Sequence, residues 1–489
     1  MSGRNSLLSG LVLACLSAVA LAQTPGVDVP PLPGPAAAIT VPAIEEFRLP
    51  NGVRVVLAAR HDVPLVSALL RVDVGSLADP APRAGLAGIT ATLLTKGARR
   101  AGKTLDATQI AREAEALGSS LTASAGWDSS LLGLTVSTPK LDAAVGLLVD
   151  LLRSPTFPAE ELERTRAQAL DALKLAQSNP TQVAQDVARR VYWGASAYGA
   201  SSTAQTLARI NRDDVVALHR LWVRPETTTL ILAGDVKLDE ARALAERALG
   251  QWPSNRMALP RMSASPAQPL ESALVLVNLP GAGQAGVAVV APFVPQDQVQ
   301  ARRIGAVANA VLGVGYSARL NQEVRIKRGL SYGAGSSAAS HRVGGLVLAQ
   351  AQTNNPTSAQ VVELMRAEIA GLATRPPDAA ELAARQAALV GGFARSLESA
   401  AGLASVVASQ MDRGRPLAEL NNTVPELLAV TAAQVGAFAG THWSAPALRT
   451  VVVGDLKAAG EALRKLDAKA LVIGMDQLDL AAPGLLRSK

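Results

Sequence analysis

Hydrophobic and polar positions follow two different periods along this chain. Apolar, β-branched runs of strand length alternate with longer stretches in which apolar residues recur at helical spacing. In 141–153, for example, Leu141, Val145, Leu148 and Leu152 fall on one helical face. The pattern predicts strands at 53–58, 65–74, 121–125, 131–137 and 227–233, and helices at 84–96, 105–117, 141–153 and 160–173. This mixture predicts an α+β fold.

Turn and capping residues mark several of these boundaries. Pro50-Asn51-Gly52 predicts a tight turn before the first apolar strand. In the helix predicted at 105–117, Thr104 is the expected N-terminal cap, and Gly118 can close the end.

The pattern lapses at 251–269 and then begins again, with strands predicted at 273–277, 286–291 and 471–474 and a helix at 301–312. The restart is a repeat, because Val215 lies 19 residues before a Gly-Asp pair and Val435 lies 19 residues before another. Trp222 and Pro225 in the first copy correspond to Trp443 and Pro446 in the second. We therefore expect two homologous domains, 46–250 and 270–480, each a mostly antiparallel sheet packed with helices and joined by the linker 251–269.

Composition fits a globular protein of more than one domain. The chain has 489 residues, of which 49% are hydrophobic and 18% charged. The net charge is +7, but the 47 Lys and Arg are dispersed among 40 Asp and Glu. Without a run of basic residues, no nucleic-acid partner is predicted.

The N-terminus has the pattern of an export signal. Arg4 precedes the apolar run 7–21, and Ala20-Leu21-Ala22 is a cleavage site of the A-x-A kind. The run is too short for a lasting transmembrane segment. Cleavage after Ala22 would leave a proline-rich linker at 23–45 and place the protein in the periplasm or outside the cell; a lipobox ending at Cys15 is the alternative. Cys15 is the only cysteine, so the mature chain would have neither disulfides nor thiolate zinc ligands.

Two further patterns carry weak chemical signals. The stretch 97–104, GARRAGKT, matches the phosphate-binding loop G-x-x-x-x-G-K-[ST]. That loop follows a buried strand, whereas the residues before it here predict a helix, so we expect an exposed basic turn. The four histidines are His61, His219, His341 and His442, and no two of them have the spacing of zinc ligands on one helix. His219 and His442 are expected to be partly buried structural residues.

A different set of motifs resembles the insulinase/pitrilysin family of zinc peptidases, from Phe47 to about Leu480. The motifs are the LPNG turn at 49–52, the frame GLAGITATLLTKG at 85–97, and the segment 312–320 followed by 323–332. The resemblance implies that the two domains together form one half of a clamshell.

In the family, the frame at 85–97 has the inverted zinc motif H-x-x-E-H. Gly88, Ala91 and Thr92 stand at those three positions. The distal zinc-ligand Glu corresponds to about 169–172, where Asp171 is the sole acid. The resemblance thus implies neither metal nor general base in this chain, and we expect no cofactor and no peptidase activity from it alone.

Arg325 and Tyr332 are retained in the second domain. By resemblance, the Tyr hydroxyl donates to the developing oxyanion and the Arg holds the substrate backbone. The family includes two-chain enzymes in which one subunit has the zinc and the other this pair. We therefore expect the non-zinc subunit of such a heterodimer, acting on peptides with a zinc-bearing partner. The alternatives are a structural or peptide-binding homologue with no catalytic role, and an independent peptidase with an unorthodox site.

Overall fold

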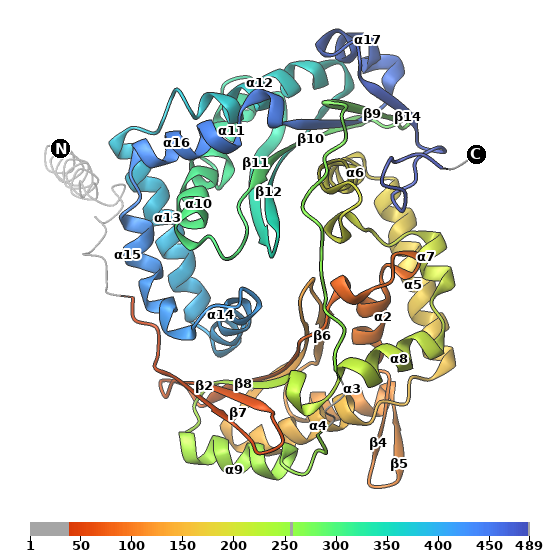
Figure 1. Ribbon diagram of the computed structural model, residues 1–489, viewed down its shortest axis with the longest axis vertical. Helices are drawn as coiled ribbons and strands as arrows, with labels where there is room; N and C mark the ends of the chain where they lie inside the picture. Colours follow the sequence, from red (N-terminus) through yellow and green to blue (C-terminus); the bar gives the residue numbers. More distant parts are fainter. Residues whose placement is uncertain (1–38, 255–257, 488–489) are drawn as a thin grey trace, which may run out of the picture. The chain divides into compact units, whose positions relative to one another are not determined.

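Two six-stranded sheets organise the computed structural model, which describes residues 39–254 and 258–487. The first sheet has the order β1-β2-β8-β3-β7-β6, in which only β2 and β8 run parallel. The second has the order β11-β12-β10-β13-β9-β14, with parallel pairs β13–β9 and β9–β14. The predicted α+β class with two sheet-containing halves is confirmed (Figure 1).

The predicted strands and helices are present, with small shifts at most ends. In the first half the strands are β1 (Ile44–Arg48), β2 (Arg54–Ala59), β3 (Leu65–Val72), β4 (Gly97–Arg100), β5 (Lys103–Asp106), β6 (Thr122–Ala125), β7 (Ser130–Ser137) and β8 (Thr228–Gly234). The helices are α2 (Leu86–Leu93), α3 (Ala107–Ala116), α4 (Leu141–Arg153), α5 (Ala159–Gln177), α6 (Pro180–Trp193), α7 (Ala204–Arg209), α8 (Arg212–Trp222) and α9 (Leu238–Leu249).

The second half repeats this plan. Its strands are β9 (Leu274–Asn278), β10 (Gln284–Phe293), β11 (Ser331–His341), β12 (Gly344–Asn354), β13 (Arg449–Gly454) and β14 (Leu471–Gly474). Its helices are α10 (Val299–Gly313), α11 (Arg319–Asn321), α12 (Ser358–Gly371), α13 (Ala379–Leu397), α14 (Ala400–Asp412), α15 (Thr423–Leu428), α16 (Ala432–His442) and α17 (Leu456–Leu466).

The predicted repeat is real in three dimensions. Helices α5 and α13 begin at Ala159 and Ala379, α6 and α14 at Pro180 and Ala400, and α8 and α16 at Arg212 and Ala432, so each pair is separated by 220 residues. The two tryptophans that marked the repeat, Trp222 and Trp443, are both buried. Strands β8 and β13, which follow these helices, each lie inside their sheet.

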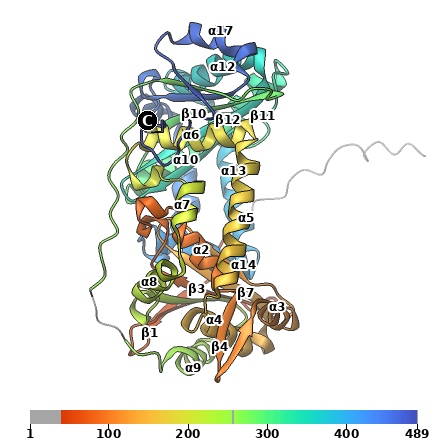
Figure 2. The same ribbon diagram turned by 90° about the vertical axis from the view of Figure 1, so that its right-hand side faces the viewer.

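Each sheet is covered on one face by helices of its own half and on the other by a helix of the opposite half. Helices α2, α4, α8 and α9 share a core with the first sheet. Its other face, which includes the buried Val56 and Ile231, is covered by α14, which packs against β3 and β8. In return, α6 packs against β10, β12 and β13 (Figure 2). The exchange therefore joins the two halves through their cores.

Ion pairs reinforce the joint at two points. Buried Arg71 on β3 bonds Asp73 and places a second nitrogen 2.7 Å from Asp412 at the end of α14. Asp128, in the turn between β6 and β7, lies 2.5 Å from Arg342, in the turn between β11 and β12. Arg71 and Asp128 are buried, so these two charges depend on their partners.

The stretch 97–106 differs from its prediction. The helix expected at 84–96 ends at Leu93, and the residues after it form the β4–β5 hairpin. Ala101 and Gly102 at its tip have φ of 46° and 78°, as a type I′ turn requires. The basic stretch is therefore a hairpin and not a turn between two helices. It lacks the strand–loop–helix geometry of a phosphate loop.

The predicted cap of the next helix is also wrong. Thr104 lies in β5, and Asp106 caps α3 by accepting a 2.8 Å hydrogen bond from the Gln109 amide. The hairpin delays the start of the helix, and Asp is the stronger capping residue. Gly118 has φ of 78° and follows the helix end as expected.

The predicted export signal at 1–22 and most of the predicted proline-rich linker at 23–45 lie outside the described residues. Within the described ranges, no helix has both the length and the apolar character needed to cross a membrane. Strand β1 begins at Ile44, just before the end of the predicted linker.

Gly286 on β10 provides a test of the helix exchange. A Cβ built at this residue would lie 2.4 Å from the carbonyl oxygen of Pro180, in the first turn of α6. Because backbone cannot yield cheaply, Gly286→Ala should lower the free energy of unfolding by about 1–3 kcal/mol, measured by urea denaturation. Gly283→Ala is the matched control, since its Cβ meets nothing within 4 Å. Equal stabilities of the two variants would contradict tight packing of α6 on β10.

Candidate functional site

The three positions of the family's zinc motif lie on α2. Gly88 and Thr92 face a cavity of about 710 Å³, while Ala91 is buried on the core side near His219. The side chain of Thr92 is already engaged, because its hydroxyl donates to the Gly88 carbonyl at 3.1 Å. Leu86, Leu93 and Leu94 are buried, so the packing face of this helix is intact.

Helix α2 is capped from a distance. Gly85, directly before the helix, has φ of 102° and offers no side chain. Asp79 accepts hydrogen bonds instead from the Gly85 amide at 2.9 Å and the Ala87 amide at 2.8 Å. A carboxylate here also suits the positive end of the helix dipole. No sequence pattern predicts this contact, because a short turn separates the acid from the helix.

Helix α5 forms the opposite wall of the cavity, which we call the α2–α5 cavity. Ala169, Ala172 and Leu173 face it, so small side chains from α5 stand opposite Gly88 and Thr92. Asp171, the sole acid where the distal ligand was expected, points elsewhere. Its side chain is 74% exposed and pairs with Lys174 at 3.1 Å.

These residues do not fit zinc. The metal requires three or four converging nitrogen, sulfur or oxygen ligands. Glycine and alanine offer no such side-chain donor, and the Thr92 hydroxyl is bonded to its own helix. Across residues 39–254 and 258–487, no group of three His, Cys, Asp or Glu side chains is arranged to hold a metal ion. No step of a reaction can therefore be assigned to a metal at this cavity.

The other lining residues give the cavity its character. Asp79, Trp127 and Asp186 line it together with Thr165 and Ser202. Burial raises the pKa of Asp79 to about 6, in spite of the hydrogen bonds from the amides of Ala87, Gly85 and Leu86. Burial also raises the pKa of Asp186, although Gln182 and Arg189 oppose the shift. Sequence reasoning missed these residues, because no motif connects them.

Arg325 and Tyr332 lie in the second half and outside the lining of the α2–α5 cavity. Arg325 belongs to the π-helical segment Gln322–Ile326, and its guanidinium carbon lies 5.1 Å above the ring of Tyr316. Tyr332 lies near the start of β11, at an irregularity in the register between Ser331 and Ala334. Its side chain is 88% exposed. In the described part of the chain, the aromatic ring recorded beside Arg325 is Tyr316, which sequence reasoning did not single out.

His219 and His442, which were expected to be structural, are both partly buried. His219 Nε2 lies 2.7 Å from the Leu152 carbonyl, and burial lowers the pKa of its ring. His442 lies partly buried against Phe438.

Comparison with known proteins identifies the family. Residues 54–204 match the family model described as insulinase (peptidase family M16), and residues 209–389 match the model of the peptidase M16 inactive domain. The chain belongs to peptidase family M16. The predicted resemblance is confirmed.

Individual relatives agree with this assignment. The chain is 27% identical over 290 residues to an uncharacterized zinc protease of Mycobacterium leprae, covering 58% of this chain and 63% of that protein. It is 25% identical over 299 residues to the non-peptidase homolog YmxG of Helicobacter pylori, covering 61% of this chain and 66% of that protein. The matched stretches thus span less than two thirds of each relative's length.

Solved structures share the M16 fold. The crystal structure of a peptidase M16 inactive domain from Pseudomonas fluorescens has a TM-score of 0.76 and 24% identity, covering 84% of this chain and 98% of that one. A protease from Helicobacter pylori has a TM-score of 0.77 and 18% identity, with coverages of 85% and 100%.

The raised pKa of Asp79 predicts a pH-dependent stability. The carboxyl ionises near 3.8 when unfolded and near 6 when folded, so the folded state binds more protons in this window and loses stability as the pH rises through it. Asp79→Asn removes the effect. Its stability relative to the parent should therefore rise by up to about 3 kcal/mol between pH 4 and pH 7.5, measured by urea denaturation.

The control is the same substitution at the exposed Asp171, for which the stability difference should stay within about 0.5 kcal/mol at both pH values. If Asp79→Asn differed from the parent by the same amount at pH 4 and pH 7.5, burial of this carboxylate would not have the assigned effect.

Proposed function

We propose that this chain is the non-zinc subunit of a two-chain M16 peptidase. A zinc-bearing homologue supplies the metal and the general base, and this chain supplies part of the peptide-binding chamber. The proposal includes export to the periplasm or beyond, on the strength of the sequence at 1–22. The observation that carries it is the contrast between the α2 positions, which cannot hold a metal, and Tyr332, which extends into solvent.

The exposure of Tyr332 supports a functional role. A tyrosine that is 88% exposed contributes little to packing, so its place at the start of β11 needs another explanation. Gly329 has φ of 62°, and a Cβ at Gly333 would meet nothing within 4 Å. These glycines leave the tyrosine hydroxyl accessible from several directions.

Arg325 complements this group. Its stacking on Tyr316 holds the guanidinium at a defined place while its donors stay available. Tyr316 is itself 64% exposed. In the proposed complex, Tyr332 donates to the carbonyl oxygen as negative charge develops, and Arg325 holds the peptide backbone.

The test is reconstitution with the zinc-bearing homologue found beside this chain in a pull-down from the native source. Tyr332→Phe should lower kcat of the assembled pair about 100-fold or more, because a preorganised donor to the oxyanion is lost. The measurement is peptide hydrolysis at saturating substrate, with and without this chain.

Two controls separate chemistry from assembly. The Tyr332→Phe chain should co-purify with the partner as the parent does and melt at the same temperature, since the missing hydroxyl is exposed. Full peptidase rate in the Tyr332→Phe pair would refute the shared-site role. A zinc subunit that gains nothing from this chain would favour the alternative, a structural or peptide-binding homologue outside catalysis.

A further inference from the structure

The lining of the α2–α5 cavity has a negative character. Asp79 and Asp186 both line it, and its lining includes no Lys, Arg or His. The remaining walls consist mainly of alanine, glycine, leucine and small hydroxyl side chains. A volume of about 710 Å³ lies within the range of ligand pockets, about 300–1,000 Å³.

Both carboxylates have oxygen capacity left for a cation. The amides of Gly85, Leu86 and Ala87 donate to Asp79, whereas an ionised carboxylate has about four acceptor sites. Asp186 binds Gln182 and Arg189 on its own helix, and the Arg189 side chain is 42% exposed. The raised pKa of each acid shows that its present partners do not offset the cost of burial.

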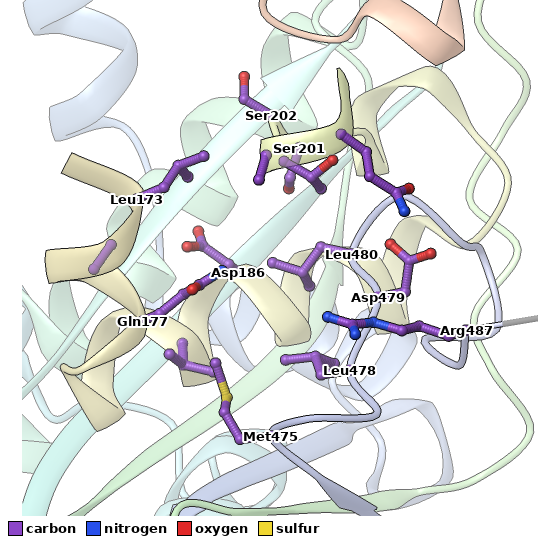
Figure 3. A pocket seen from close by; sticks show the side chains of 15 residues that line it. Leu173, Gln177, Asp186, Ser201, Ser202, Met475, Leu478, Asp479, Leu480 and Arg487 are labelled. Atoms are coloured by element: carbon purple, nitrogen blue, oxygen red, sulfur yellow. The ribbon is translucent and has the colours of Figure 1, made fainter. Parts of the chain in front are cut away.

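The cavity continues into a neighbouring one. A second cavity of about 460 Å³ shares Leu173, Ala176, Asp186 and Ser202 with the first. It extends to Met475, Leu478 and Leu480 and to the charged Asp479 and Arg487. Figure 3 shows the Asp186 carboxylate below Leu173 and beside Leu480, with Asp479 and Arg487 beyond Leu480. An elongated ligand can therefore extend from the α2–α5 cavity, which both acids line, into the second cavity past Asp186.

Trp127 completes the chemistry of the site. Trp127 lines the same cavity as the two carboxylates, and an indole ring can attract a cation as well as an apolar stem. The combination of apolar walls, an indole and carboxylates matches a side chain with a methylene stem and a positive end. A neutral or anionic side chain would bring no positive charge to these two acids.

We propose that the α2–α5 cavity binds the lysine or arginine side chain of a peptide. This assigns the chain a site of its own, apart from the partner and from Arg325 and Tyr332. The positions that hold metal ligands elsewhere in the family here open the space that the side chain enters.

The test uses the isolated full-length chain and two fluorescent ten-residue peptides of Ala, Gly and Ser. One peptide has a central arginine, and the other has citrulline, its uncharged isostere, at the same place. Fluorescence anisotropy at pH 7.5 should show that the arginine peptide binds about tenfold or more tightly. Equal affinity for the two peptides, or no binding of either, would overturn the proposal.

Two variants locate the binding. Asp186→Asn should reduce the preference for arginine over citrulline toward unity. Gly88→Leu should weaken arginine-peptide binding about tenfold or more, because the new side chain occupies the cavity. A Cβ at Gly88 meets nothing within 4 Å, so the variant should fold. If Gly88→Leu bound the arginine peptide as the parent does, the cavity would not be the site.

Matched controls exist for both changes. Gly146, in helix α4, also has open space at its Cβ and lies outside the cavity lining, so Gly146→Leu should bind like the parent. Asp171→Asn removes an acid from the exposed side of α5 and should also leave binding unchanged. These measurements need no partner, so a negative result would leave the two-chain proposal intact. Failure of the two-chain proposal would likewise leave the binding of a basic side chain untouched.

Discussion

The reciprocal packing of α6 and α14 is the constraint on which both halves of this protein depend. A sheet with two apolar faces needs two covering layers, and each half supplies only one layer for its own sheet. Buried residues such as Val56 on the first sheet and Val290 on the second lie on the faces covered by the exchanged helices. Loss of either helix would expose a full sheet face, so neither core is stable without the other half.

The contacts of α2 explain why this helix is stable without a metal site. The helix is fixed by its buried leucines and by Asp79 at its N-terminus, none of which is a metal ligand. Gly88 and Thr92 face the cavity, so exchange of their side chains costs little core packing. Of the three motif positions, only Ala91 lies on the core side, where a small side chain fits the packing.

Much of the fold could be predicted from the sequence where the signal is local. The strongly amphipathic α4 and the short strand β14 have the predicted limits, and the tryptophans marked the repeat. Contacts between segments distant in sequence could not be predicted. Nothing in the spacing of α6 shows that it packs on the opposite sheet, and this placement brings Asp186 to the cavity wall. The contact of Arg325 with Tyr316 was missed for a related reason, since a π-helical turn sets it.

The helix exchange also decides the order in which the polypeptide can fold. Strand β8 completes the first sheet at Gly234, but α14 ends only at Asp412. Until that residue has been synthesised, one face of the first sheet has no native cover, and α6 has no completed sheet to pack on. Contacts so distant in sequence make folding slow. The two halves must therefore mature together, as one cooperative unit that forms late in synthesis.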